Sequence, residues 1–240
     1  KAYFNQQTFP FYDHSEAAFF LAYREKRLVG RIAAIDHTLF NQYQQSKQGS
    51  FFFFECQDDF EAAEKLLFTA ESWLKNRGLT EVVGPKGFGS LDGYGLLIDG
   101  FTQEQTMAFT EYNFPYYRLF IENFGYNKKI DLNSYQIKTS EFDLPNWVNQ
   151  SANHLKKELN LSVKTFDSVK KLEQAGHWLF QLYNDSFTTN WEYYRLPDNE
   201  ITFLMKELKP IVVPQLIKVI YQDIEPIGML IGLPDYSKAR

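Results

Sequence analysis

One stretch, residues 51–89, limits the fold of this chain more than any other part of the sequence. Four consecutive phenylalanines at residues 51–54 stand between polar residues, and a bulky apolar run too short for a helix indicates a buried strand. From residue 60 onward apolar residues recur mostly three and four positions apart, which predicts a helix with one apolar face: Ala63, Leu66, Leu67, Ala70, Trp73 and Leu74. Residues 79–83 are predicted to be a short strand. Strand, helix and strand in so short a stretch predict a βαβ unit with parallel strands.

The junction between the first strand and the helix is the first place to look for function. Asp58 or Asp59 can cap the helix, and Gly78 is placed to end it in a left-handed conformation. Ligands of βαβ units commonly bind where the strand passes into the helix, which here means residues 55–59. The alternative is that the unit is only the core of a fold.

Composition excludes several classes of protein. With 240 residues, of which 44% are hydrophobic and 23% charged, the chain is globular. A net charge of −5 without a basic block argues against nucleic acid as a partner. One cysteine, Cys56, excludes an internal disulfide and a cysteine-rich metal site. No apolar run approaches the roughly 18 residues of a membrane span, so no membrane insertion and a cytoplasmic location are expected; a homodimer is compatible with the sequence.

The rest of the chain is predicted to alternate strands and helices around this unit. Residues 84–101 hold six glycines in turns, without a nucleotide-binding fingerprint, and residues 37–50 form a loop or a short helix. The other expected elements are a hairpin at 19–35, a helix at 113–125, a strand at 130–138, a helix at 147–159, a strand at 161–166, helices at 169–187 and 198–208, and a hairpin at 215–233. The expected fold class is α/β, as an α+β fold with a mixed sheet.

The two hairpins can be laid on each other without a gap. At an offset of 228 − 30 = 198 residues, Gly30 falls on Gly228, Glu25 falls on Asp223, and apolar positions coincide along both strands. Any two hairpins share an apolar pattern, but the matched glycine and the matched acidic turn residue go beyond that pattern. A repeat of this length indicates two copies of one fold.

With this repeat, the chain resembles the GNAT acyltransferase superfamily. Residues 19–138 fit the later elements of that fold, and residues 161–233 fit its earlier elements. Segments 19–37, 84–101, 113–126 and 227–235 also resemble a bacterial family described as N-acetyltransferase-like. The resemblance implies tandem GNAT-like domains, clipped at both ends: a first domain at residues 1–140 lacking its first strand and helices, a linker helix at 141–160, and the first part of a second domain at 161–240.

The resemblance implies an N-acyltransferase that moves an acyl group from acetyl-CoA or another acyl-CoA to an amine, with a small molecule or a peptide as acceptor and no metal. Two rivals stay open. One is a Fem-type aminoacyl or peptidyl transferase, which also pairs two GNAT-like domains and uses aminoacyl-tRNA. The other is a non-catalytic ligand-binding protein whose GNAT-like domain is degenerate.

GNAT proteins hold the pyrophosphate of acyl-CoA on backbone N–H groups in a glycine-bearing loop before the helix. The resemblance therefore assigns cofactor binding to Phe54, Glu55, Cys56 and Gln57 at the strand end. The following residues depart from the family pattern: residues 57–62 lack glycine, and they carry three carboxylates, which repel a pyrophosphate. This departure favours the second domain as the donor site.

The resemblance also implies catalytic residues. Glu55 matches a base on the central strand, with helix capping or pairing to a lysine as the alternative. In the family a tyrosine acts as the general acid, and its position falls on Phe120 in this chain. Tyr116 and Tyr117 lie one turn earlier, where they can take over the role of the general acid or serve only in packing.

Three further aromatic residues are candidates for binding the acceptor: Trp191, Tyr193 and Tyr194. Ordinary packing is the alternative for this cluster. The four histidines lack zinc-site spacing, so metal is not expected. Cys56 is expected to be an inert buried thiol.

Overall fold

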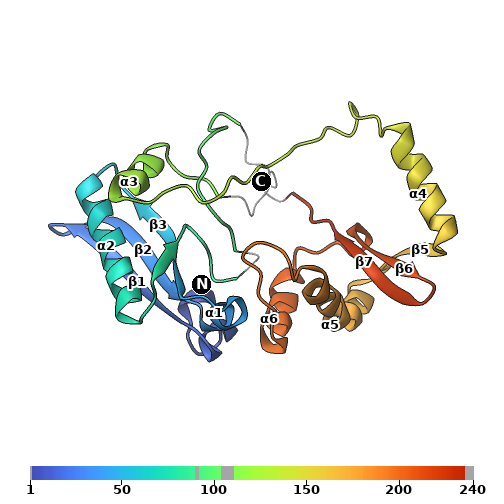
Figure 1. Cartoon of the computed structure of the whole chain (residues 1–240), viewed down its shortest axis with the longest axis horizontal. Helices are drawn as coiled ribbons and strands as arrows, with labels where there is room; N and C mark the ends of the chain where they lie inside the picture. The colour runs from blue at the N-terminus through green and yellow to red at the C-terminus, as the bar shows by residue number, and fades with distance from the viewer. Residues whose placement is uncertain (1, 90–91, 104–110, 236–240) are drawn as a thin grey trace. The chain divides into compact units, whose positions relative to one another are not determined.

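A computed structural model of the chain describes residues 2–89, 92–103 and 111–235, which belong to two compact units (Figure 1). The first unit consists of Lys1–Ser134 together with Glu192–Tyr194, and the second of Tyr135–Trp191 and Arg195–Arg240. Each unit has its own sheet and its own helices. The identification of each unit with one acyltransferase-like copy stays a prediction.

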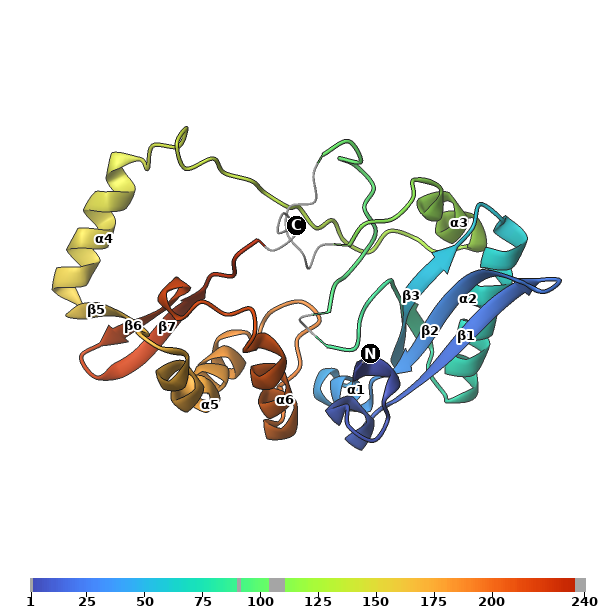
Figure 2. The ribbon, with the colours of Figure 1, turned by 180° about the vertical axis from the view of Figure 1, so that it is seen from behind.

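The first unit is built on a mixed four-stranded sheet, which confirms the expected fold class. Its strands lie in the order β1-β2-β3-β4; β1, β2 and β3 are antiparallel, and β3 and β4 are parallel, as the βαβ pattern predicts. Figures 1 and 2 show this sheet and its helices from opposite sides. The elements are β1 (Glu16–Arg24), β2 (Arg27–Asp36), α1 (Thr38–Gln44), β3 (Gln48–Cys56), α2 (Phe60–Asn76), β4 (Glu81–Val83) and α3 (Tyr116–Phe124).

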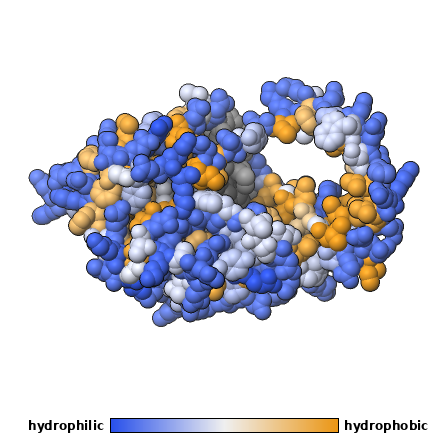
Figure 3. Space-filling view, in the orientation of Figure 1, coloured by the Kyte–Doolittle hydropathy of each residue, from blue (hydrophilic) through white to orange (hydrophobic). Residues whose placement is uncertain are grey.

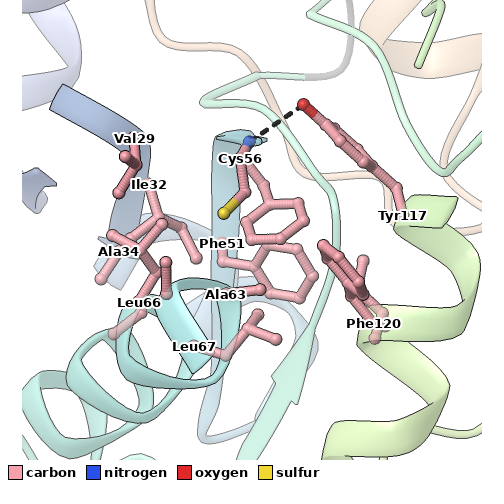
Figure 4. Close-up of a cluster of buried hydrophobic side chains, with 14 of the residues drawn as sticks. Val29, Ile32, Ala34, Phe51, Cys56, Ala63, Leu66, Leu67, Tyr117 and Phe120 are labelled. Carbon is pink, nitrogen blue, oxygen red and sulfur yellow. Dashed lines mark hydrogen bonds between the residues drawn. The ribbon is translucent and has the colours of Figure 1, made fainter. Parts of the chain in front are cut away.

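The apolar stripe of α2 covers one face of this sheet (Figure 4). Ala63, Leu67 and Leu74 are completely buried, and they pack with Ile32 of β2 and Phe51 of β3. Burial of large aliphatic and aromatic side chains contributes roughly 1.5–3 kcal/mol per residue, so this contact dominates the stability of the unit. Helix α3 packs on the same core through Tyr117, Phe120 and Ile121.

A β-bulge at Phe53 explains why four consecutive phenylalanines fit into one strand. Arg31 pairs with Glu55 and Ala33 with Phe52, so β3 contains one more residue than β2 over this interval. Phe53 takes the extra position with a positive φ of 50°. The bulge bends β3 and increases its twist just before its end.

The second unit has a three-stranded antiparallel sheet in the order β5-β6-β7. Helix α5 packs on one face of it through Ala175 and Leu179, which form a small core with Val219 of β6. The elements are α4 (Asn146–Glu158), β5 (Leu161–Thr165), α5 (Val169–Ser186), α6 (Asp198–Leu208), β6 (Ile217–Gln222) and β7 (Glu225–Ile231).

The strand expected at residues 130–138 is wrong. These residues are all exposed and pair with neither sheet. The alternation of apolar and polar residues indicated a strand, but alternation fixes a strand only where a neighbouring strand supplies the hydrogen bonds. The turns expected at residues 84–101 are present in the described part, where Gly93 and Gly95 have positive φ. Within the described ranges, no helix combines the length and the apolarity needed to cross a bilayer.

Candidate functional site

The end of β3 has one edge that no strand of the described residues pairs with. Strand β4 pairs with β3 only at residues 48–50 and then leaves it. Past this point, the amide of Lys86 donates to the carbonyl oxygen of Phe51 at 2.8 Å. We call residues 51–56, on the side facing away from β2, the open edge of β3. An extended ligand can add to such an edge as another strand would.

Two tyrosines of α3 bind Cys56, the last residue of this edge, and Figure 4 shows the bond made by Tyr117. The amide of Gln57 donates to Val29 of β2, so the backbone groups of Cys56 face the opposite way, toward α3. The amide of Cys56 donates to the hydroxyl oxygen of Tyr117 at 3.0 Å, and Tyr116 donates to the carbonyl oxygen of Cys56 at 2.9 Å. The structure therefore brings together four of the predicted site residues: Glu55, Cys56, Tyr116 and Tyr117.

The two tyrosines differ in what their hydroxyl protons do. The hydroxyl of Tyr116 donates a hydrogen bond to the carbonyl oxygen of Cys56. The hydroxyl of Tyr117 instead accepts a hydrogen bond from the amide of Cys56, and its own proton is bound to no acceptor among the described residues. Burial raises the pKa of both hydroxyls, so both stay protonated near neutral pH. Tyr117 can therefore donate its proton to a ligand at the open edge without losing its bond to Cys56.

Glu55 projects from the sheet face opposite α2 and is solvent-exposed. Arg31 of the neighbouring strand forms an ion pair with it at 2.8 Å, and the guanidinium also lies over the ring of Phe53. The alternative stated from the sequence was helix capping or pairing to a lysine; in the structure the partner of Glu55 is instead an arginine.

Glu111 is a candidate that the sequence did not reveal. Its side chain lies directly over Gly93, where a Cβ atom would come within 2.3 Å of Oε1, and Gly93 also has a positive φ of 85°, a conformation that favours glycine. Partial burial raises the pKa of Glu111, and the nearby carboxylates of Asp92 and Glu55 raise it further. No local sequence pattern connects Glu111 with Asp92 and Glu55, because only Asp92 lies in the glycine-rich segment 84–101 and the proximity of the three carboxylates depends on how the chain folds.

The beginning of α2 is already occupied by the protein's own charges. Asp59 caps the helix by accepting a hydrogen bond from the amide of Ala62 at 3.1 Å. Arg24, at the end of β1, pairs with Asp59 at 2.6 Å and with Glu61 at 2.9 Å. A pyrophosphate at this helix end would have to displace the carboxylate of Asp59, as the absence of glycine in residues 57–62 had indicated.

Asp59→Ala is expected to destabilise the first unit by about 1 kcal/mol, the usual effect of losing an N-cap. Arg24 and the Ala62 amide lower the pKa of Asp59, so its contribution is present above the unfolded pKa of about 4. It is lost as the pH falls through the lower pKa of the folded state. Urea titrations at pH 7 and pH 3 should show a smaller deficit of the variant at pH 3 than at pH 7. Asp58→Ala, at the neighbouring exposed position, is the control; an equal loss in both variants would exclude the cap.

Cys56 is a buried thiol, and burial raises its pKa to about 11. A thiol of this kind stays protonated at neutral pH and is a poor nucleophile. His37 is also buried, and burial lowers its pKa well below the ordinary value. Among the described residues, no group of three or more histidine, cysteine or acidic side chains is placed to hold a metal ion.

The aromatic residues expected to bind an acceptor lie in two different units. Tyr193 and Tyr194 are buried in the first unit, where Tyr193 packs edge-on against Tyr43 and Tyr194 against His37. Trp191 belongs to the second unit and is 40% exposed. In this structure the two tyrosine rings are packing residues, and the acceptor-binding role of the three residues stays a prediction.

Two curated proteins are similar to this chain along almost its whole length. "Bacterial ceramide synthase" of Caulobacter vibrioides (strain NA1000 / CB15N) is 30% identical over 236 residues, which are 97% of this chain and 60% of that protein. "Protein YghO" of Escherichia coli (strain K12) is 25% identical over 227 residues, which are 95% of this chain and 57% of that protein. The chain thus spans less than two thirds of the length of these relatives. No family model matches it.

Proposed function

We propose that this chain is part of a GNAT-type N-acyltransferase that joins a fatty acyl group to the amine of a lipid precursor. The observation that carries the proposal is the open edge of β3. Strands β3 and β4 diverge after residue 50, and the edge of β3 that no described strand pairs with ends at Cys56, beside Tyr117, whose hydroxyl proton has no acceptor among the described residues. An acyl-CoA can lay its amide-containing arm along such an edge and bring its thioester to the strand end.

The similarity to a bacterial ceramide synthase supports the choice of acceptor. A ceramide is the amide of a fatty acid with a long-chain amino alcohol, so its synthesis is an N-acylation. The reaction breaks the thioester C–S bond and forms a C–N bond; the amine loses one proton and the departing thiolate gains one. Each proton transfer requires a positioned side chain, and one such side chain typically accelerates the reaction by about 10²–10⁴-fold.

The geometry favours particular residues for these two proton transfers. Tyr117 can protonate the thiolate, because its hydroxyl proton is uncommitted within the described part of the chain. Glu111 suits the base better than Glu55, since the carboxylate of Glu55 is held by Arg31, while burial and the carboxylates of Asp92 and Glu55 raise the pKa of Glu111. A base works best when its pKa lies near the working pH.

The decisive experiment is an assay of the intact protein with palmitoyl-CoA or acetyl-CoA and sphinganine, with the amide product identified by mass spectrometry. N-acetylsphinganine, whose nitrogen is blocked, is the control acceptor. We expect a long-chain amide only from free sphinganine. Absence of product, together with absence of binding of either CoA by calorimetry, would overturn the proposal. Transfer from aminoacyl-tRNA instead would establish the Fem-type alternative.

Tyr117→Phe is expected to lower kcat by about 10²-fold, because it removes the proton donor, with little change in the KM for acyl-CoA. Tyr116→Phe is the matched control: it also loses a hydroxyl bound to Cys56, but its proton is already committed to the Cys56 carbonyl. Steady-state kinetics of both variants test the assignment. Equal losses in the two variants would mean that the hydroxyls only hold the strand end.

The occupied beginning of α2 favours one alternative, a protein that binds no CoA in its first unit. Calorimetry separates the cases. If the pyrophosphate binds at α2, Asp59→Ala removes a competing carboxylate and tightens acyl-CoA binding. If affinity does not change, the phosphates bind elsewhere in the protein. If neither CoA binds the intact protein at all, a non-catalytic role is the better description.

A further inference from the structure

The hairpins of the two units have the same register. Ala22 pairs with Gly30 in β1–β2, and Ile220 pairs with Gly228 in β6–β7. The offsets, 220 − 22 and 228 − 30, are both 198. In both hairpins the register then shifts by one position, directly after Ala22 and directly after Ile220. The repeat that the sequence indicated therefore extends to the hydrogen-bond pattern and to an irregularity within it.

The turns of the two hairpins also agree. Glu25 has a φ of 55°, and Asp223, at the same offset of 223 − 25 = 198, has a φ of 54°. Positive φ is common in tight hairpin turns but uncommon for residues other than glycine, and here it falls on an acidic residue at the equivalent position of both turns. The first unit can therefore serve as a guide to what packs on the hairpin of the second.

In the first unit, one face of the hairpin lies under α2 (Figure 4). Val29 is 7% exposed and Ile32 is 1% exposed, and both pack in the core with Leu66 of α2. Ala22 lies against the same core. Strand β2 is also paired on both sides, by β1 and by β3.

In the second unit, no helix or strand among the described residues covers the equivalent face. The counterparts of Ala22, Val29 and Ile32 at the offset of 198 are exposed by 37%, 47% and 58%: Ile220, Ile227 and Leu230. Val163 of β5, opposite Ile220, adds a fourth aliphatic side chain and is 56% exposed. Figure 3 shows apolar side chains over the β6–β7 region. Strand β7 is an edge strand, with no partner on its outer side among the described residues.

The two equivalent glycines, Gly30 and Gly228, differ in what packs against them. A Cβ atom on Gly30 would come within 2.8 Å of Leu66 of α2 and 2.9 Å of the carbonyl of Glu55 in β3. Glycine is therefore required where the helix and the next strand approach the hairpin. At Gly228 the one neighbour among the described residues within 4 Å of such an atom is Ile220, at 3.9 Å. The second hairpin has the same small residue without the close approach that explains it in the first.

We propose that the face formed by Ile220, Ile227 and Leu230 binds a strand and helix of the same protein, as β3 and α2 bind the first hairpin. The strand pairs with the outer edge of β7, and the helix lays an apolar stripe on the three aliphatic side chains. A segment of the same protein is the occupant because the first unit supplies its own β3 and α2. The two relatives match this chain over 57% and 60% of their own length, and the rest of each relative leaves room for such a segment. This inference does not depend on the reaction.

Thiol labelling of the intact protein tests the proposal. Ile227→Cys places a thiol on the face, and Ile224→Cys places one in the hairpin turn, where the side chain is 84% exposed. Maleimide labelling is followed on the separate peptides by mass spectrometry, so that Cys56 does not contribute. We expect position 227 to react at least about 10²-fold more slowly than position 224, as expected for a thiol reached only by local opening. Equal rates would overturn the proposal.

Two further measurements identify the occupant. The slow rate at position 227 should not depend on protein concentration; faster labelling on dilution would mean that a second copy covers the face, contrary to the proposal. A photo-crosslinking residue at position 227 should give a crosslink within one chain to a helix outside residues 1–235. A crosslink between chains would also overturn it.

Gly228→Ala provides an independent test. Against a packed helix, the added methyl group overpacks the contact and should lower the Tm of the intact protein by about 5 °C. On a bare face, alanine in a strand is neutral or slightly stabilising relative to glycine. Gly30→Ala, where α2 is in place, is the matched reference, and an unchanged Tm for Gly228→Ala beside a lowered Tm for Gly30→Ala would contradict the proposal.

Discussion

Lys86→Met is expected to destabilise the first unit by about 3–5 kcal/mol, the usual effect of breaking a buried ion pair from one side. Lys86 is paired with Glu192, and the two side chains are 8% and 5% exposed. The ammonium group also lies 3.7 Å from the ring centroid of Phe40. Removing the lysine leaves the Glu192 carboxylate buried with too little compensation, and urea denaturation at pH 7 measures the loss.

The residues around the ion pair explain why the loss of stability is specific to Lys86. Gln48 of β3 donates to Glu192 at 2.9 Å, and Lys129 lies 3.8 Å from the same carboxylate. Burial lowers the pKa of Lys86, while the charge of Glu192 partly offsets that effect. Lys129 is 41% exposed and cannot replace a buried ammonium group, so Lys129→Met is the control, with an expected loss below about 1 kcal/mol.

A double variant separates the energy of the pair from the energy of an orphaned charge. Lys86→Met combined with Glu192→Gln removes both charges and keeps an amide oxygen that accepts from Gln48. We expect it to recover most of the stability, since a buried pair replaced as a whole is often neutral. Additive losses in the double-variant cycle would show that the two charges do not interact.

This ion pair also shows what the sequence could not reveal. Lys86 and Glu192 are 106 residues apart, and no local pattern connects them. Glu192 lies between aromatic residues that the sequence offered as pocket walls, yet the segment Glu192–Tyr194 belongs to the first unit and is buried there. Long-range contacts of this kind follow from tertiary packing, whereas hydrophobic periodicity reports only which face of an element is covered.

Hydrophobic periodicity was sufficient to predict an element where the segment that packs against it lies close in the sequence. The helix expected from residue 60 onward is α2, and the hairpins are β1–β2 and β6–β7. It failed at residues 130–138, where alternation is present but a pairing strand is not. At the candidate site, the resemblance to a family identified Glu55, Tyr116 and Tyr117, which do lie together. It missed Arg31 and Glu111, because partners across a sheet or a loop are set by register and by loop conformation.

Glu111→Gln is expected to lower kcat for acyl transfer by about 10²–10⁴-fold, if Glu111 takes the proton from the attacking amine. The substitution should not unfold the protein. Partial burial and the carboxylates of Asp92 and Glu55 raise the pKa of Glu111, so its ionised form is disfavoured in the folded state. Neutral glutamine therefore leaves the Tm at neutral pH unchanged or slightly higher, which separates a catalytic loss from a structural one.

The pH dependence of kcat distinguishes Glu111 from Glu55 as the base. The base acts when deprotonated, so activity should rise as the pH increases through the raised pKa of Glu111, and this limb should disappear in Glu111→Gln. Glu55→Gln is the matched variant. It removes a like charge that raises the pKa of Glu111, so the limb should move to lower pH while most of the rate is retained. The opposite result, in which Glu55→Gln abolishes transfer and Glu111→Gln retains it, would assign the base to Glu55 and make its ion pair with Arg31 a resting arrangement that the bound amine displaces.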